Sequence, residues 1–327
     1  MDSSSGRIPT LFESGCSSCP AGDVCPGDVS SPCGCVWVGS KRYDCTDCHI
    51  LCRDRRSPST LVRDEDFTVR LAEGRWFDDV TIDHSYAPLD LPVLVPLRVR
   101  DLGLDAVPCL TAIGFDLEDL VTRPNAAGAV MAKRSRTRVS LRERVGASSE
   151  TTIIAVLNGD DDRLEGLWGM DRARFFDGLR AQGVGALTGP TFSVYDDEPA
   201  SHRTLMMMRQ FKVLEEAQAA GIVAVPNLYW RGPYDVRAWA DWIRGNPGVQ
   251  FVSRDFSRTK QDPAFHAQFS VLLDLLRLVD RPLHIIVVGV GAGRGAYVLS
   301  RLGQLGCGGT IATASPVIMA QRGRRLA

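Results

Sequence analysis

The second half of the chain alternates apolar strand candidates with helix candidates, and this alternation limits the possible folds more than any other feature. Six segments read as strands, and a stretch with helical character follows most of them. They are TTIIAVLNG (151–159), GALTGPTFSVY (185–195), IVAVPNLYW (222–230), VQFVSRDFS (249–257), LHIIVVGVG (283–291) and TIATASPVI (310–318). Nearly continuous apolar strands that alternate with helices predict a parallel sheet covered by helices on both faces.

Shorter apolar runs precede this region and bear on whether the sheet closes. Runs between residues 67 and 121 read as short strands: FTVRLAEGRWF, DVTIDH, LPVLVPLRV and VPCLTAIGF. Prolines at 88, 92, 96 and 108 interrupt them, which favours sheet edges and loops over central strands. One or two of these strands, added to the later units, approach the number that closes a barrel. We therefore expect an α/β fold, a TIM-type (β/α)-barrel that is irregular or incomplete, with an open doubly wound parallel sheet as the alternative.

The N-terminal region is rich in cysteine. Eight of the ten cysteines lie in the first 52 residues: Cys16, Cys19, Cys25, Cys33, Cys35, Cys45, Cys48 and Cys52. Two CxxC pairs are present, and a two-residue gap lets both sulfurs of a pair face one tetrahedral ion. The surrounding residues 13–35 contain few large apolar groups, so a bound metal would supply folding free energy that burial cannot. We expect a structural zinc module, with an iron–sulfur cluster, disulfides or free thiols as alternatives.

Charge and hydropathy limit the possible partners. The formal net charge is −1, so no overall positive field favours nucleic acid or an anionic membrane. The N-terminus lacks the pattern of a secretory signal, and no segment is apolar enough to span a bilayer, so we expect a cytoplasmic protein without a membrane partner. A basic arm at 133–144 carries six basic residues and one acidic residue, and it is a local candidate for partner binding. The sequence leaves the oligomeric state open.

These features divide the chain into three regions. Residues 1–60 form the expected cysteine-rich metal-binding module, and an Arg-rich, Pro- and Ser-containing linker leads out of it. Residues 61–150 hold the short strands and the basic arm. Residues 151–327 hold the βα repeats.

In a parallel α/β fold, functional residues gather at the carboxyl ends of the strands. Several carboxylates follow strand candidates and can bind a divalent cation or act as general acid and base; the ordinary alternative is a solvated loop or a helix cap. The catalytic candidates chosen on this basis are Asp160, Asp162, Asp197 and Asp255. The fourth strand ends in SRDFSRTK, where Ser253, Arg254, Asp255 and Ser257 form a mixture suited to phosphate or carboxylate recognition.

The fifth strand ends in a glycine-rich loop, VGVGAGRGAYVL. Its glycines alternate, so it has neither the GxGxxG spacing of a dinucleotide fold nor the Lys and Ser/Thr of a P-loop. A helix follows, and its first backbone N–H groups can receive a phosphate. The phosphate-binding candidates are Gly291, Gly293, Arg294 and Gly295; the alternative is a plain tight turn.

Residues 155–245 resemble a family associated with phages and mobile elements, the domain of unknown function 4417. The matching positions are Pro190, Phe192, Ser193, Tyr195, Asp197, Pro199, Pro226 and Trp230. Thr191 stands where the family pattern has Asp. The resemblance implies a mobile-element setting and assigns no reaction.

Together these observations lead to a hypothesis and two alternatives. The leading hypothesis is a barrel enzyme that acts on a phosphate-bearing or nucleic-acid-linked substrate, with a structural metal module. One alternative is a non-enzymatic protein of a mobile element that binds DNA, RNA or another protein. The other is an iron–sulfur redox or radical enzyme.

Overall fold

The structure is a computed structural model. It describes residues 80–86, 89–97, 110–125, 129–132, 140–194, 200–230 and 232–323, and two short strands at 37–38 and 41–42. The chain divides into two compact units, residues 1–74 with 192–209 and residues 75–191 with 210–327. The eight N-terminal cysteines that form the predicted metal module lie outside the described residues.

The second unit is built on parallel strands that form two four-stranded sheets, in the orders β4-β5-β6-β7 and β3-β10-β9-β8. The strands are β3 (Leu94–Pro96), β4 (Ala112–Asp116), β5 (Thr152–Val156), β6 (Val184–Thr188), β7 (Val223–Val225), β8 (Phe251–Asp255), β9 (His284–Val288) and β10 (Gly308–Thr313). Two isolated parallel bridges, Asn227↔Ser253 and Leu97↔Gly114, join one sheet to the other. The strands therefore follow one another around a closed ring in chain order. The predicted TIM-type barrel is confirmed, and the open doubly wound sheet is excluded.

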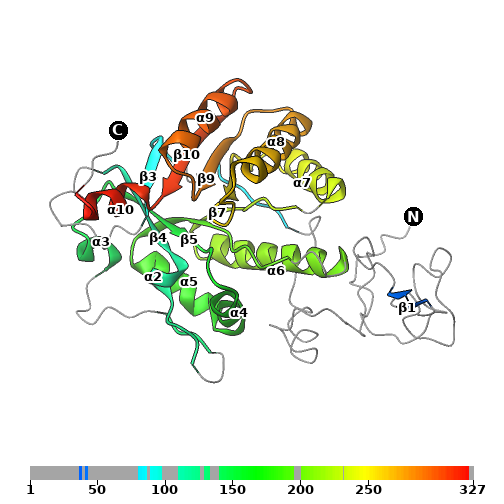
Figure 1. The fold of residues 1–327 in the computed structure, drawn as a ribbon. Helices are drawn as coiled ribbons and strands as arrows, with labels where there is room; N and C mark the ends of the chain where they lie inside the picture. The colour runs from blue at the N-terminus through cyan, green and yellow to red at the C-terminus, as the bar shows by residue number, and fades with distance from the viewer. Residues whose placement is uncertain are drawn as a thin grey trace. The chain divides into compact units, whose positions relative to one another are not determined.

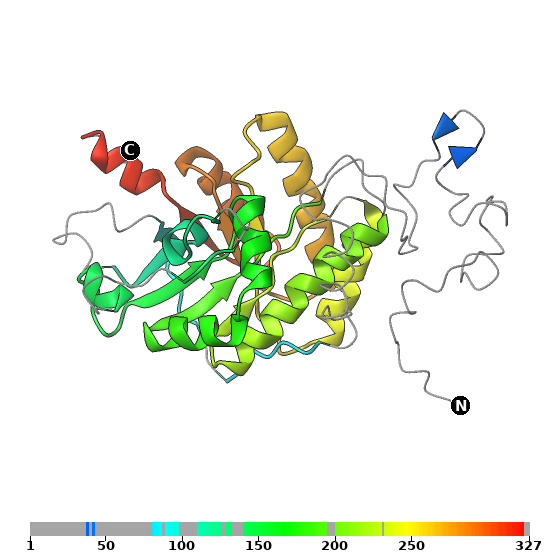
Figure 2. The same cartoon turned by 90° about the horizontal axis from the view of Figure 1, so that it is seen from below.

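Helices connect the strands and lie outside the ring (Figures 1 and 2). They are α2 (Leu117–Leu120), α3 (Leu141–Arg144), α4 (Asp161–Gly169), α5 (Arg172–Ala181), α6 (Ala200–Ala219), α7 (Pro233–Gly245), α8 (Asp262–Val279), α9 (Ala292–Gly303) and α10 (Ser315–Gln321). The long helices α7 and α8 pack side by side, as Figure 1 shows. None of the helices in the described residues is both long and apolar enough to cross a membrane.

The proline-containing segments before residue 121 contribute two strands to the barrel, within the one or two that the sequence predicts. Both β3 and β4 are full members of the ring, and Pro96 lies in register with Thr313 of β10. Each of the two is the outer strand of its four-stranded sheet, as the prolines indicated. The Leu97 N–H donates to Thr313 of β10, so the nitrogen of Pro96, one residue earlier, faces β4, to which β3 is joined by a single bridge.

The barrel interior is a packed apolar core. Alternate strand residues point inward and form one buried cluster: Val95, Leu97, Ala112, Ile154, Val156, Ala186, Val223, Val225, Phe251, Ile286, Val288 and Ala312. The alternation follows from the two-residue period of a strand. Because the lumen is filled, chemistry has to take place at an end of the barrel.

A histidine closes a gap between two barrel strands. β7 and β8 are joined by a single bridge near their carboxyl ends, and His84 fills the space at the other end. Its Nε2 atom lies 2.9 Å from the Ala224 carbonyl oxygen, and its Nδ1 atom accepts the backbone N–H groups of Gln250 and Phe251, each at 3.0 Å. The segment 79–84 was predicted as a strand, and the described part of it is not one. The imidazole therefore makes the hydrogen bonds between β7 and β8 that a strand backbone would otherwise make at this end.

The end of the basic arm packs on the barrel. Residues 133–139 lie outside the described part of the chain, and α3 begins after Ser140 with a reciprocal capping box to Glu143. The Arg142 guanidinium donates to the carbonyl oxygens of Ser148 and Thr151. Arg142 of the basic arm therefore forms hydrogen bonds within the second unit.

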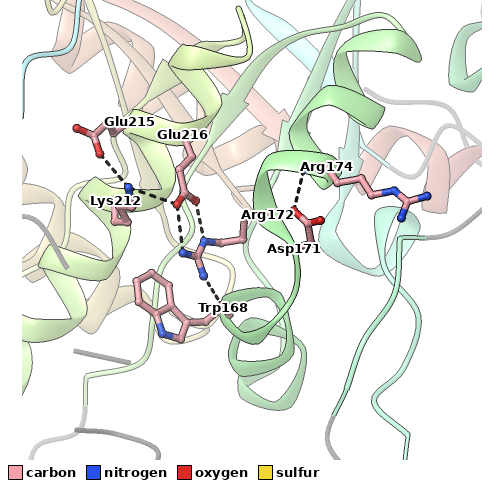
Figure 3. Close-up of polar contacts among 7 residues, drawn as sticks. All are labelled: Trp168, Asp171, Arg172, Arg174, Lys212, Glu215 and Glu216. Atoms are coloured by element: carbon pink, nitrogen blue, oxygen red, sulfur yellow. Dashed lines mark hydrogen bonds and ion pairs between the residues drawn. The ribbon is translucent and has the colours of Figure 1, made fainter. Parts of the chain in front are cut away.

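An ion-pair cluster ties α5 to α6 on the outside of the barrel (Figure 3). Arg172 is 9% exposed and binds the Glu216 carboxylate through two hydrogen bonds of 2.7 and 3.1 Å. Its guanidinium also donates to the Trp168 carbonyl oxygen and lies 4.2 Å from the centre of the Trp168 ring. Lys212 lies 3.5 Å from the same carboxylate. Paired, hydrogen-bonded charges of this kind are costly to separate.

We expect Glu216→Gln to lower the free energy of unfolding by about 2–3 kcal/mol, because it removes the carboxylate charge that the little-exposed Arg172 guanidinium binds through two hydrogen bonds. Urea unfolding monitored by circular dichroism measures the change. The matched control is Glu215→Gln on the same helix, whose carboxylate is 39% exposed and which should change stability by less than about 0.5 kcal/mol. Equal effects of the two substitutions would contradict the assignment.

The first unit has few described residues. β1 (Trp37–Val38) pairs with β2 (Lys41–Arg42) in antiparallel register. In its other segment, the Arg209 guanidinium lies 4.0 Å from the centre of the Phe192 ring, and both residues are buried. Three successive methionines of α6, Met206 to Met208, are also buried.

Candidate functional site

The barrel lining changes from apolar to polar at the carboxyl ends of β5, β7 and β8. Two residues beyond the lumen residues Val156 and Val225 come Asn158 and Asn227, and β8 ends in Asp255. The two-residue period points these side chains to the same side as the lumen residues before them. Asn227 is fully buried, whereas Asn158 and Asp255 are partly exposed. The end of the lumen is therefore polar and reachable from solvent.

These polar side chains form one hydrogen-bonded chain. The Asn158 amide nitrogen donates to Asp255 Oδ2 at 2.9 Å, and the Thr191 hydroxyl donates to Asn158 Oδ1 at 3.2 Å. The Asn227 amide nitrogen donates to the Thr191 oxygen at 2.5 Å, and the Ser253 hydroxyl donates to Asn227 Oδ1 at 3.1 Å. Each side chain donates a hydrogen bond to the next, in the order Ser253, Asn227, Thr191, Asn158 and Asp255. The last acceptor is the Asp255 carboxylate. We call Asn158, Thr191, Asn227, Ser253 and Asp255 the polar network.

Asp255 receives two more bonds from Ser257. The Ser257 backbone N–H donates to Oδ1 at 2.7 Å, and its hydroxyl lies 3.0 Å from Oδ2. Together with Asn158, three donors fix the plane of the carboxylate: Oδ2 accepts from Asn158 and the Ser257 hydroxyl, and Oδ1 accepts one N–H and keeps a lone pair available. A partly exposed carboxylate held in this way can exchange a proton with a bound molecule.

Two further residues hold the network in place. Gln210 on α6 is fully buried, and its amide accepts the Asn227 N–H at 2.7 Å and donates to the Asn227 carbonyl oxygen at 3.1 Å. Gly189 has φ +85°, and a Cβ atom there would lie 2.8 Å from Asn158 Oδ1. A larger residue at 189 would be strained and would displace Asn158.

Arg254 faces away from the network although its neighbours in sequence belong to it. Its guanidinium donates to the Leu228 carbonyl oxygen at 2.8 Å and to Gln268 at 2.9 Å, and it lies 4.2 Å from the centre of the Trp230 ring. Burial lowers the pKa of Arg254 to about 10. Strand alternation places it on the outside of the barrel wall, so it is a packing residue and not the anion ligand that its sequence context indicated.

A pocket of about 400 Å³ opens beside the network, between the loops that follow β8 and β9. Its lining includes Ser257, Thr259, Lys260, Gly291, Gly293 and Arg294. Gly289 has φ +82°, and a Cβ atom there would lie 2.5 Å from the Ser257 Cα atom, so glycine permits the two loops to touch. Ser257 lines the pocket and also donates to Asp255 of the polar network.

The amino end of α9 faces this pocket. The first intrahelical bond at this end joins the Gly295 N–H to the Gly291 carbonyl oxygen at 2.8 Å. The N–H groups of residues 292–294 therefore have no partner within the helix, and the helix dipole adds partial positive charge there. Of the predicted phosphate residues, Gly291, Gly293 and Arg294 line the pocket. Gly295 lies against Ile311, and its N–H donates within the helix, to the Gly291 carbonyl oxygen.

Arg294 is already bonded. It donates to the Thr259 carbonyl oxygen at 2.8 Å, to the Lys260 carbonyl oxygen at 2.6 Å and to the Asp262 carboxylate at 2.6 Å. These bonds fix the loop that carries Lys260. The structure gives Arg294 the role of holding the pocket wall, and it leaves Lys260 as the exposed cation beside the α9 terminus.

Two of the other predicted carboxylates, Asp160 and Asp162, form no hydrogen bond with the network in the described part of the chain. Asp160 forms an ion pair with Arg163 at 3.0 Å and with Arg258 at 3.1 Å. Asp162 is exposed in the first turn of α4. Asp197 lies outside the described residues. Of the four catalytic candidates, the described structure brings Asp255 into the polar network.

The sequence indicates Ser253 and Ser257 for phosphate or carboxylate recognition, and the structure brings both to Asp255 or its network. Asn158, Thr191 and Asn227 are visible in the sequence as polar residues at strand ends, but no local pattern marks their convergence with the serines. Gln210 gave no signal, because it lies within a helix. Within the described residues, no group of three or more His, Cys, Asp or Glu side chains is arranged to hold a metal ion.

Comparison with known proteins adds little to this geometry. No protein-family model matches the chain, and no curated protein matches it. Two solved structures that resemble it are variants of the tryptophan synthase α-subunit of the hyperthermophile Pyrococcus furiosus. Each is 18% identical, covers 70% of this chain and 90% of its own, and has a TM-score of 0.39. The barrel assignment rests on the strand order and not on this likeness.

Proposed function

We propose that the protein is an enzyme that acts on a small phosphate-bearing substrate by proton transfer at Asp255. The observation that carries the proposal is the position of Ser257, which lines the pocket beside α9 and also donates to the Asp255 carboxylate. A molecule with its phosphate in that pocket would place its adjoining atoms near a fixed carboxylate. Proximity of this kind is the main requirement for acid–base catalysis.

The chemistry of the pocket supports a phosphate. The N–H groups at the start of α9 and the hydroxyls of Ser257 and Thr259 are hydrogen-bond donors, and Lys260 supplies a full positive charge. Loops after late strands of a barrel are frequent phosphate sites. The pocket volume of about 400 Å³ suits a small molecule and not a macromolecular surface.

Binding of inorganic phosphate is the first test. We expect wild-type protein to bind phosphate, measured by isothermal titration calorimetry at low ionic strength, and Lys260→Ala to weaken the affinity about tenfold. Lys212→Ala is the matched control, because Lys212 lies on α6 in the ion-pair cluster and should leave phosphate affinity unchanged. Equal affinities of the Lys260 and Lys212 variants, or no binding at millimolar phosphate, would overturn the proposal.

Three sequence expectations remain proposals. The cysteines between Cys16 and Cys52 would hold zinc, or alternatively iron–sulfur, and metal analysis with an absorption spectrum separates the two. The resemblance to the domain of unknown function 4417 supports a mobile-element setting. A cytoplasmic location fits reduced, metal-bound cysteines.

A further inference from the structure

We propose that the polar network is a hydroxyl-binding subsite, so that the substrate of the proposed enzyme is a phosphorylated polyhydroxy compound such as a sugar or polyol phosphate. The inference rests on the proposed function, because it takes the phosphate to lie in the pocket beside α9. It goes beyond the proposed function by identifying the group attached to the phosphate as one that carries several hydroxyls.

The unused hydrogen-bonding capacity of the network identifies the ligand chemistry. The Asn158 amide donates one N–H to Asp255 and accepts one hydrogen bond from the Thr191 hydroxyl. One N–H and one lone pair of the amide therefore remain for a ligand. Asn227 likewise retains an N–H after its bond to Thr191. Asp255 retains a lone pair on Oδ1, because Oδ2 already accepts from Asn158 and the Ser257 hydroxyl. Donors and acceptors therefore alternate over a few neighbouring atoms.

A hydroxyl group matches this alternation, because it donates and accepts at the same atom. A second anionic group would be repelled by the Asp255 carboxylate, and an apolar group would leave the amides unsatisfied. A cation would suit Asp255 but not the amide donors. The phosphate and the hydroxyls would then meet at Ser257, which lines the pocket and donates to Asp255 of the polar network.

A buried hydroxyl supports the same inference independently. Thr188 ends β6 in register with Val156 and Val225, both of which point into the lumen, so Thr188 points there too. It is fully buried, and its Oγ1 atom has no hydrogen-bond partner in the structure. A buried hydroxyl without a partner is costly, and a polar ligand above it would satisfy it.

The experiment compares two phosphate esters of equal length. Ribitol 5-phosphate and n-pentyl phosphate are titrated into the full-length protein by calorimetry, and inorganic phosphate is the reference. We expect ribitol 5-phosphate to bind at least about tenfold more tightly than n-pentyl phosphate. Asn158→Ala should remove that difference and leave the affinity for inorganic phosphate unchanged.

Thr191→Val keeps the shape of the side chain and provides a second variant if Asn158→Ala does not fold. The matched control is Thr151→Val at the opposite end of β5, which should keep the preference for the polyol. Equal binding of the two esters to wild-type protein would overturn the hydroxyl subsite and leave the phosphate proposal standing. Failure of all three ligands to bind would overturn both.

Discussion

Asp255→Asn is expected to lower turnover by about 10²–10⁴-fold while phosphate binding persists. The substitution keeps the size of the side chain but removes its ability to take up a proton in the reaction, which is the typical contribution of a general base. Turnover is followed by NMR in deuterated buffer with a set of phosphorylated polyols, which detects both solvent deuterium incorporation and new products. Inorganic phosphate titration on the same sample shows whether the pocket is intact.

The control for this substitution is another carboxylate at the same end of the barrel. Asp162 is exposed in the first turn of α4, and Asp162→Asn should retain turnover within about twofold. If Asp162→Asn lost as much activity as Asp255→Asn, the catalytic assignment would move to the α4 rim. If Asp255→Asn kept full turnover, proton transfer at Asp255 would be excluded.

His84→Ala is expected to lower the free energy of unfolding by about 3–5 kcal/mol. It removes a fully buried ring that bonds Ala224 on one strand and Phe251 on the next, and it leaves both a cavity and unpaired backbone groups. Urea unfolding measures the change, with His266→Ala as the control because His266 is exposed on α8. A loss below about 1 kcal/mol would show that β7 and β8 hold together without the imidazole.

The same histidine makes stability depend on pH. Burial lowers the pKa of His84 below its ordinary value of 6.5, and burial also lowers the pKa of His284. Below pH 6.5 the unfolded chain takes up protons that the folded barrel resists, so stability falls as the pH falls from 6.5 toward the folded-state values. The slope has an upper limit of about 1.4 kcal/mol per pH unit for each histidine. Urea midpoints that stay constant between pH 7 and 5 would contradict this.

The sequence determined the class of fold because the responsible signal is local. A strand such as Ile153–Val156 is apolar at successive positions, and only a strand covered on both faces has that pattern. The same local signal placed polar residues after each strand and a glycine-rich turn before α9. Prolines correctly predicted that β3 lies at a sheet edge, because Pro96 has no N–H to donate and β3 is joined to β4 by a single bridge.

Only the tertiary structure decided which strand-end residues act together. Asn158, Thr191 and Asn227 follow three different strands and Asp255 ends a fourth, and they meet because the ring closes through single bridges at Asn227 and Leu97. The same closure turned Arg254 outward and engaged Arg294 with its neighbouring loop. Strand alternation is local, whereas register and closure depend on contacts between residues far apart in the chain. The sequence alone therefore identified polar residues at strand ends as candidates for a site. The closure of the barrel determined which of them lie together.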